Sequence, residues 1–321
     1  MKTMTQTDDV EVVAEGLHVT LADLQAGLGS DVITEEVLDH LKAGHPGASV
    51  VLRNARVAWD RANRTRVWGG IQGKWVLLEH SEGFKMWIKL GDSVSSAIIR
   101  GVYDRATTNI VREHLRPGGN FIDIGANVGW FSFVSAHYYN NAKGGHVYTF
   151  EPQKNIFEHI VRSIASNGYD KIISAHRMAL GDRNGEIQMI DAGLNSGGSS
   201  IVRSEITRPD FETVPIRRFD EVAPKVERVD LIKIDIEGAE PLFLQGAREF
   251  ISRHRPPIIS EVSVRKLRLV SGSDAASYIR SVAEFGYVPL KVAGNGRLVE
   301  LDSGDLVDDR TVINVYFKPV P

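Results

Sequence analysis

Short apolar runs alternate with helical segments from Asn120 onward, and this alternation limits the fold more than any other feature of the chain. The runs contain few polar positions, which is typical of strands that are buried on both faces of a parallel sheet. Many connections span only two to six residues, and together with the alternation they favour a mostly parallel sheet covered by helices. The predicted strands are Phe121–Ile124, Val147–Phe150, Ile172–Arg177, Leu231–Asp235 and Ile258–Val262. The sequence therefore predicts an α/β fold with a mostly parallel sheet and helices on both faces.

Further elements are predicted around this sheet. Alternating apolar residues between Lys74 and Leu90 indicate a β-hairpin. A closing antiparallel pair is expected from Tyr287–Val292 and Val312–Phe317, and short strands from Glu186–Ile190 and Val214–Arg217. Helices are predicted from Ser93, at Asp104–Leu115, Gly129–Asn141, Gln153–Asn167 and Ala239–Arg253, and after a cap at Ser273.

Residues 1–70 are predicted to form a separate amino-terminal helical extension, and residues 71–321 the main domain. The polar residues 1–15 are expected to be disordered, and Thr20–Gly27 and Asp31–Lys42 to be helices. Arginines between Arg53 and Arg66 are interpreted as a solvated helix face; the alternative is a surface for a phosphate-bearing substrate. The extension is expected to serve as an oligomerisation or substrate-contact segment.

The composition excludes several classes of protein. Hydrophobic residues make up 42% of the chain and charged residues 25%, as in ordinary globular proteins. The net charge of −3 gives no general attraction to nucleic acid or anionic membrane. No apolar run approaches the roughly 18 residues of a membrane span, and the start of the chain lacks the features of a signal peptide. Without cysteine there are no thiolate metal sites. A cytoplasmic protein with neither nucleic-acid nor membrane partners is expected.

The first strand ends in a Gly-x-Asn-x-Gly turn formed by Gly125, Asn127 and Gly129. Glycine lets a turn backbone approach a ligand closely. Asp123 precedes the turn, where it would repel a phosphate and attract an amino group, and Glu151 follows the next strand, where a carboxylate can accept from ribose hydroxyls. These charges favour S-adenosylmethionine over a dinucleotide. The alternative is a tight turn whose small residues serve packing alone.

Acidic residues follow several strands, and the carboxyl ends of parallel strands meet at one edge of a sheet. Asp235 and Glu237 follow the fourth strand and Glu261 lies on the fifth. The structural alternative is that such acids cap helices. Lys233 lies two residues before Asp235 on the same strand face, so it is expected to pair with Asp235 or with an acid on a neighbouring strand.

Five motifs together resemble the FkbM family of methyltransferases over about residues 74–292. They are Asp123-x-Gly-x-Asn-x-Gly, Phe150-Glu-Pro, Ala179-Leu-Gly-Asp182, Asn195-Ser-Gly-Gly-Ser-Ser and Lys233-x-Asp-x-Glu-Gly-x-Glu240. The resemblance implies a class I, Rossmann-like methyltransferase that transfers a methyl group from S-adenosylmethionine to a hydroxyl of a sugar or polyketide-type molecule.

Carried over to this chain, the resemblance gives roles to individual residues. The turn residues would hold the cofactor, Asp123 and Asp235 would face its methionine end, and Glu151 its ribose. Ala179 and Asp182 would meet the adenine edge, and these two rest on the resemblance alone.

Asp235, Glu237 and Glu261 are the candidates for a general base, with Asp235 first. A divalent metal held by these acids is the less favoured alternative, so no metal ligand is assigned. Tyr103, Asn195, Ser199 and Lys233 are candidate substrate residues. The loop with Asn195 and Ser199 is expected to close over the acceptor, and the alternative is an ordinary surface loop. Lys233 either orients the substrate or forms a structural ion pair, and Tyr103 either lies against the cofactor or packs on its neighbours. The competing hypotheses are an amine or carboxylate acceptor and a non-catalytic module that binds S-adenosylmethionine.

Overall fold

A computed structural model of the protein describes residues 11–14, 17–20, 73–190 and 211–320. The expected helix at Asp31–Lys42, the arginine-rich stretch and the loop with Asn195 and Ser199 lie outside the described residues. Among the described helices, none is both long and apolar enough to cross a bilayer.

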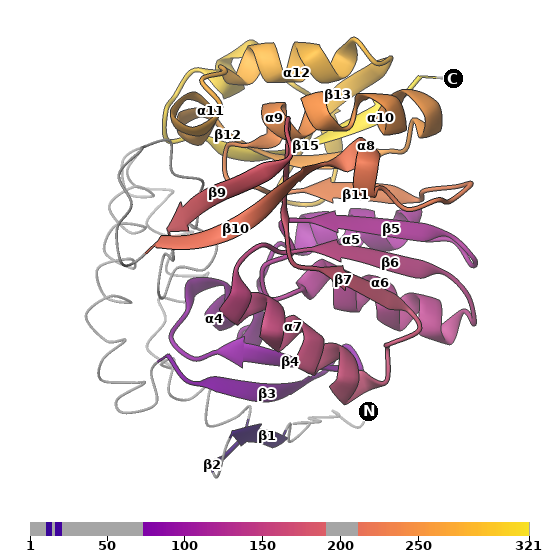
Figure 1. Ribbon diagram of the computed structural model, residues 1–321, viewed down its shortest axis with the longest axis vertical. Coiled ribbons are helices and arrows are strands. Elements are labelled where there is room, and N and C mark those ends of the chain that lie inside the picture. Colours follow the sequence, from indigo (N-terminus) through magenta and orange to yellow (C-terminus); the bar gives the residue numbers. More distant parts are fainter. Residues whose placement is uncertain (1–10, 15–16, 21–72, 191–210, 321) are drawn as a thin grey trace, which may run out of the picture.

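An eight-stranded sheet with the order β14-β13-β15-β12-β11-β5-β6-β7 forms the centre of the fold (Figure 1). Five neighbouring strands are parallel, and β15 runs antiparallel to both β12 and β13. The strands are β5 (Asn120–Ile124), β6 (His146–Phe150), β7 (Ile173–His176), β11 (Leu231–Ile234), β12 (Ile258–Ser263), β13 (Tyr287–Val292), β14 (Leu298–Glu300) and β15 (Val312–Pro319). The predicted α/β fold with a closing antiparallel pair is confirmed.

Each face of the sheet carries its own hydrophobic core. On β5, Phe121 packs into one core, whereas Ile122 and Ile124 pack into the other, because successive side chains of a strand point to opposite faces. The first core contains α5 (Arg105–His114), α6 (Trp130–Asn141) and α7 (Lys154–Asn167). The second contains α8 (Phe219–Val222), α9 (Glu240–Gly246), α10 (Arg248–His254), α11 (Val264–Val270) and α12 (Ala275–Ala283).

The predicted hairpin is present as β3 (Trp75–His80) and β4 (Phe84–Lys89), followed by α4 (Ser93–Ile99). It packs against α7, whose side chains cover the outer edge of β4. The backbone N–H groups of Lys85 and Trp87 donate to Asn167 Oδ1 (2.7 Å) and Ser163 Oγ (2.8 Å). These bonds satisfy donors that an edge strand would otherwise leave unpaired. The hairpin is thereby fixed beside the parallel sheet (Figure 1).

Residues 1–15 were expected to be disordered, but Glu11–Ala14 forms strand β1. The helix predicted at Thr20–Gly27 is wrong for Thr20, which is the last residue of a strand. Leu17–Thr20 is strand β2, paired with β1, and β1 extends the hairpin sheet, with Val13 opposite Leu77. Pairing with an existing sheet edge satisfies backbone groups, which composition alone cannot reveal.

A third sheet, of three strands, is separate from the main sheet and from the hairpin sheet. β8 (Ala179–Gly181) pairs parallel with β10 (Phe211–Arg218), and β10 pairs antiparallel with β9 (Gly185–Ile190). Both predicted short strands are confirmed, but their union with β8 in a separate sheet was not predicted. Figure 1 shows β9 and β10 as a ribbon that leaves the main sheet.

Two helix boundaries differ from the prediction. The single helix expected at Ala239–Arg253 is divided into α9 and α10, because Asp220 caps the second part: its carboxylate accepts from the N–H groups of Glu249 (3.2 Å) and Phe250 (2.9 Å). The predicted cap at Ser273 is wrong. Asp274 caps α12, since its Oδ1 accepts from the N–H of Ser277 at 2.8 Å.

Candidate functional site

A cavity of about 390 Å³ lies at the carboxyl ends of β5, β6 and β11. The chain continues from β5 to β6 and β7 on one side, whereas β11 and β12 lie on the other side of β5. The strand order therefore reverses between β5 and β11, where α/β sheets bind their ligands. The cavity has the size of a site for a small molecule or cofactor.

The turn after β5 forms one wall of the cavity. Gly125 has a φ of +75°, and a Cβ at this position would lie 1.9 Å from the backbone oxygen of Asp235, so only glycine fits. Asn127 has a φ of +52°, and its Oδ1 is buried without a hydrogen-bond partner in the described part of the chain. Gly129 does not line the cavity; its φ of +86° and its contact with Phe133 explain the glycine there.

Glu151 lines the cavity at the end of β6, and only 3% of its surface is exposed. Its Oε2 accepts from the N–H of Asn127 (2.9 Å) and its Oε1 from the N–H of Gln153 (3.0 Å). Burial raises the pKa of Glu151 to about 7, and these hydrogen bonds act in the opposite direction. The carboxylate is thus held rigidly against the turn and retains lone pairs for further donors.

Of the two residues predicted to contact adenine, only Ala179 lines the cavity. Ala179 lines the cavity together with Met178 and Leu180, and these residues give an apolar wall. Asp182 does not line the cavity: it follows β8, and its carboxylate bonds the Arg183 guanidinium at 3.3 Å. Its position gives no support to the predicted role.

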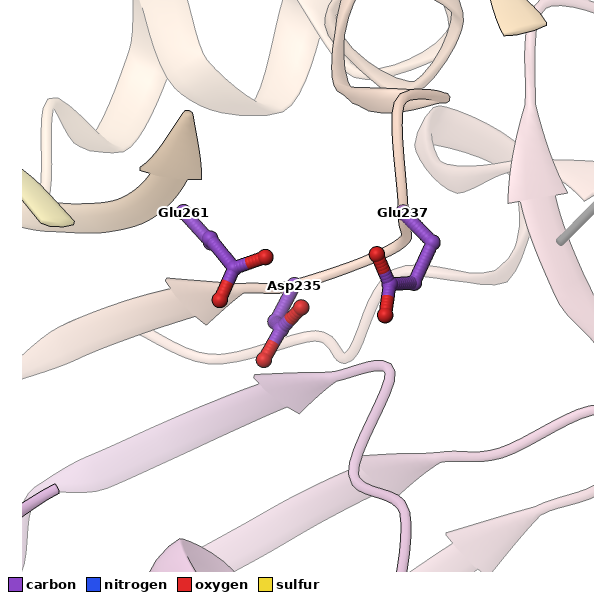
Figure 2. A group of neighbouring side chains, drawn as sticks. All are labelled: Asp235, Glu237 and Glu261. Carbon is purple, nitrogen blue, oxygen red and sulfur yellow. The ribbon is translucent and has the colours of Figure 1, made fainter. Parts of the chain in front are cut away.

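Three acidic residues that line this cavity bring their carboxylates together. Asp235 and Glu237 follow β11, Glu261 comes from β12, and one oxygen of each lies within 4.8 Å of the others (Figure 2). Burial and the neighbouring charge of Asp235 raise the pKa of Glu237 to about 7 and raise the pKa of Glu261 well above its usual range. Glu237 also has a φ of +57°, which is unusual for a residue with a side chain. Glu237 and Glu261 therefore keep a proton to a higher pH than ordinary carboxyl groups do.

Two lysines balance part of this negative charge. Lys233, with 4% of its side chain exposed, donates from Nζ to Asp235 Oδ2 at 3.0 Å, so the predicted pairing of Lys233 with Asp235 is confirmed. Lys266 on α11 pairs with Glu237. The three carboxylates thus share two ammonium groups, and both ammonium groups would repel a cation. The oxygens are close enough for a divalent metal, but these charges disfavour one.

Asp123 lies one strand away from this group and outside the cavity lining. It is fully buried on β5, where its Oδ2 accepts from Ser132 Oγ at 2.6 Å, and its Oδ1 has no hydrogen-bond partner among residues 73–190 and 211–320. Burial raises its pKa, and the charge of Lys233 opposes this shift. Asp123 therefore acts on the site through Lys233 rather than by lining it.

Tyr103 lines the cavity from the loop before α5. Burial, with Asp235 as the largest of several negative charges around it, raises the pKa of Tyr103 well above 10, so the phenol stays protonated and can donate a hydrogen bond to a ligand. Among the other predicted substrate residues, Lys233 is outside the lining, and Asn195 and Ser199 are outside the described residues. The sequence analysis missed Lys266, which comes from the unpredicted helix α11.

The cavity fits the groups of S-adenosylmethionine. Glu151 can accept from ribose hydroxyls, and the wall from Met178 to Leu180 suits an adenine ring. The unpartnered Asn127 Oδ1 and the Asp235 carboxylate can accept from the ammonium of the methionine end.

Comparison with known proteins gives a family model, a curated relative and several structures. The model described as "Methyltransferase FkbM domain" matches residues 123–289, more than half of the chain. Methyltransferase sdnD from Sordaria araneosa is 27% identical over 164 residues, which are 41% of this chain and 62% of that protein. The chain thus spans less than two thirds of this relative's length.

Two solved structures are similar at a low level. Methyltransferase FkbM from Methylobacillus flagellatus is 18% identical, with a TM-score of 0.41, over 70% of this chain and 54% of that one. An O-methyltransferase from Bacillus cereus in complex with SAH is 13% identical, with a TM-score of 0.36, over 67% of this chain and 81% of that one.

Proposed function

Because the chain belongs to the FkbM methyltransferase family, we propose that it transfers the methyl group of S-adenosylmethionine to a hydroxyl of a sugar or a polyketide-type small molecule. The observation that carries this proposal is the group of carboxylates beside the cofactor cavity (Figure 2). An alcohol is a poor nucleophile at neutral pH, so transfer of a methyl group to its oxygen is faster when a nearby base removes the hydroxyl proton.

The contacts of the three acids favour Glu261 as that base over Asp235, the first candidate from the sequence. Asp235 is paired with Lys233 and Glu237 with Lys266, so an ammonium group already occupies an oxygen of each carboxylate. The Glu261 carboxylate forms no ion pair within the described ranges. Because burial raises the pKa of Glu261, its ionised form binds a proton more strongly than an ordinary carboxylate does.

In the proposed reaction, Glu151 and the Gly125–Asn127 turn hold the cofactor, and Asp235, paired with Lys233, lies at its methionine end. Bound S-adenosylmethionine supplies an electrophilic methyl group, which the acceptor oxygen takes while sulfur keeps the bonding electron pair. Glu261 accepts the proton of the acceptor hydroxyl. The protonated phenol of Tyr103 can donate to a ligand oxygen and helps to hold the acceptor in line.

A labelled-methyl assay with glycosylated and hydroxylated metabolites tests this proposal. Glu261→Gln is expected to lower kcat by roughly 10²- to 10⁴-fold without changing the affinity for S-adenosylhomocysteine. Asp235→Asn should remove most turnover while the fold stays intact. The exposed Glu113, remote from the cavity lining, provides the matched control Glu113→Gln. Full turnover by Glu261→Gln would exclude it as the base.

The same assay separates the alternatives. Label on nitrogen or in an ester would indicate an amine or carboxylate acceptor. Binding of S-adenosylmethionine without transfer to any acceptor would indicate a binding module.

A further inference from the structure

A second cavity, of about 310 Å³, adjoins the first. Tyr103 lines both cavities, so its side chain forms a shared wall. The second cavity lies between the β3–β4 turn, the corner from α4 to α5, helix α5 and the first residue of α6. Apart from Trp130, its lining residues precede residue 123, where the family match begins. This cavity therefore belongs to a part of the chain that the family model does not cover.

Aromatic rings form one side of the second cavity. The indole of Trp130 is 6% exposed, and its Nε1 donates to Thr108 Oγ1 at 3.0 Å. His80 meets this indole edge-on at 4.9 Å between ring centroids, and Tyr103 does so at 6.4 Å. Burial lowers the pKa of His80, so its ring is neutral at pH 7. The rings offer a rigid, uncharged surface for the body of a ligand.

Charged residues also line the second cavity, and their balance is positive. Arg112 pairs with Glu82, so these two charges cancel. Arg105 donates from Nε to the backbone oxygen of Gly101, and its terminal nitrogens have no hydrogen bond or ion pair with any residue that the structure describes. One guanidinium fork is thus left at the cavity, in the geometry that binds carboxylate and phosphate groups.

We propose that the second cavity binds an anionic group, a carboxylate or a phosphate, at the far end of the acceptor whose hydroxyl is methylated in the first cavity. Arg105 pairs with the anion, the Trp130 indole supports the body of the ligand, and Tyr103 lies between the anionic end and the reacting oxygen. The inference rests on the proposed function, since it takes the first cavity to be the site of methyl transfer.

The test uses the full chain saturated with S-adenosylhomocysteine. Binding of glucuronate, glucose 6-phosphate and uncharged glucose is measured by saturation-transfer NMR, with inorganic phosphate as a competitor. Both anionic sugars should bind roughly twofold to fivefold more tightly than glucose, because a charge pair with an exposed side chain such as Arg105 has about that effect. Arg105→Gln should abolish this preference, Arg105→Lys should keep part of it, and Arg280→Gln, on the exposed surface of α12, should keep all of it.

The preferred anionic sugar identifies carboxylate or phosphate as the group bound. Three results would overturn the inference. The first is equal binding of glucose and both anionic sugars, and the second is no detectable binding of either anionic sugar at millimolar concentration. The third is a full preference for the anionic sugars in Arg105→Gln. So would inorganic phosphate that binds as tightly as glucose 6-phosphate, since the aromatic side would then contribute nothing. Failure of the proposed function gives a different result: binding of the anion that depends on Arg105, with no methyl group transferred to oxygen.

Discussion

Replacing Gly125 by alanine tests whether the turn after β5 needs glycine for its approach to β11. The left-handed φ of +75° alone costs alanine about 1–2 kcal/mol. The new Cβ would also lie 1.9 Å from the backbone oxygen of Asp235 and 2.9 Å from the Ile236 side chain. Because a backbone atom cannot rotate away, the two strand ends must separate, at a further cost of roughly 1–3 kcal/mol.

Gly168→Ala is the matched control, since Gly168 has a φ of +66° and no atom of the described residues lies within 4 Å of an added Cβ. For both variants, urea unfolding measures the free energy of unfolding, and calorimetry measures the affinity for S-adenosylhomocysteine. Gly168→Ala should lose about 1–2 kcal/mol of stability and keep its affinity. Gly125→Ala should lose more stability than Gly168→Ala. It should also bind S-adenosylhomocysteine at least about tenfold more weakly, because separation of the strand ends breaks a charged hydrogen bond to the ligand. Equal stability and equal affinity of the two variants would refute the reasoning.

Three further predictions concern the buried acids and the metal. Glu151→Gln should weaken binding of S-adenosylhomocysteine by about tenfold to hundredfold in calorimetry, because it removes a charged acceptor; unchanged affinity would exclude contact with the ribose. Burial raises the pKa of Glu240 to about 7, whereas the unfolded carboxyl titrates at 4.5, so this group's stabilising contribution is present below pH 4.5 and lost as the pH rises through 7. Glu240→Gln should therefore raise the free energy of unfolding by up to about 3 kcal/mol at pH 8 and not at pH 4, and an equal change at both values would contradict the pKa. EDTA should leave turnover unchanged, and a loss that magnesium restores would show that the carboxylates bind a metal despite Lys233 and Lys266.

The sequence predicted the features that depend on local patterns. The parallel strands were visible as apolar runs, and the pairing of Lys233 with Asp235 followed from the two-residue period of a strand. The edge of the sheet at which Asp235, Glu237 and Glu261 meet also followed from the strand order expected of such folds.

Features that depend on distant contacts were not predictable. The break between α9 and α10 depends on Asp220, which lies 29 and 30 residues before the N–H groups that it accepts. The charge balance of the acids depends on Lys266, which comes from a short helix without a strong sequence pattern. The second cavity combines the hairpin turn, α5 and Trp130, and nothing in the sequence shows that these segments meet.

Nuclear magnetic resonance of the reaction product tests the central claim most directly. The full chain is incubated with S-adenosylmethionine carrying a ¹³C-labelled methyl group and with a panel of hydroxylated acceptors. The account predicts a labelled methyl group bonded to oxygen, formed by the wild-type chain and by Glu113→Gln and strongly reduced in Glu261→Gln. A label bonded to nitrogen, or no transfer although S-adenosylhomocysteine binds, would contradict it.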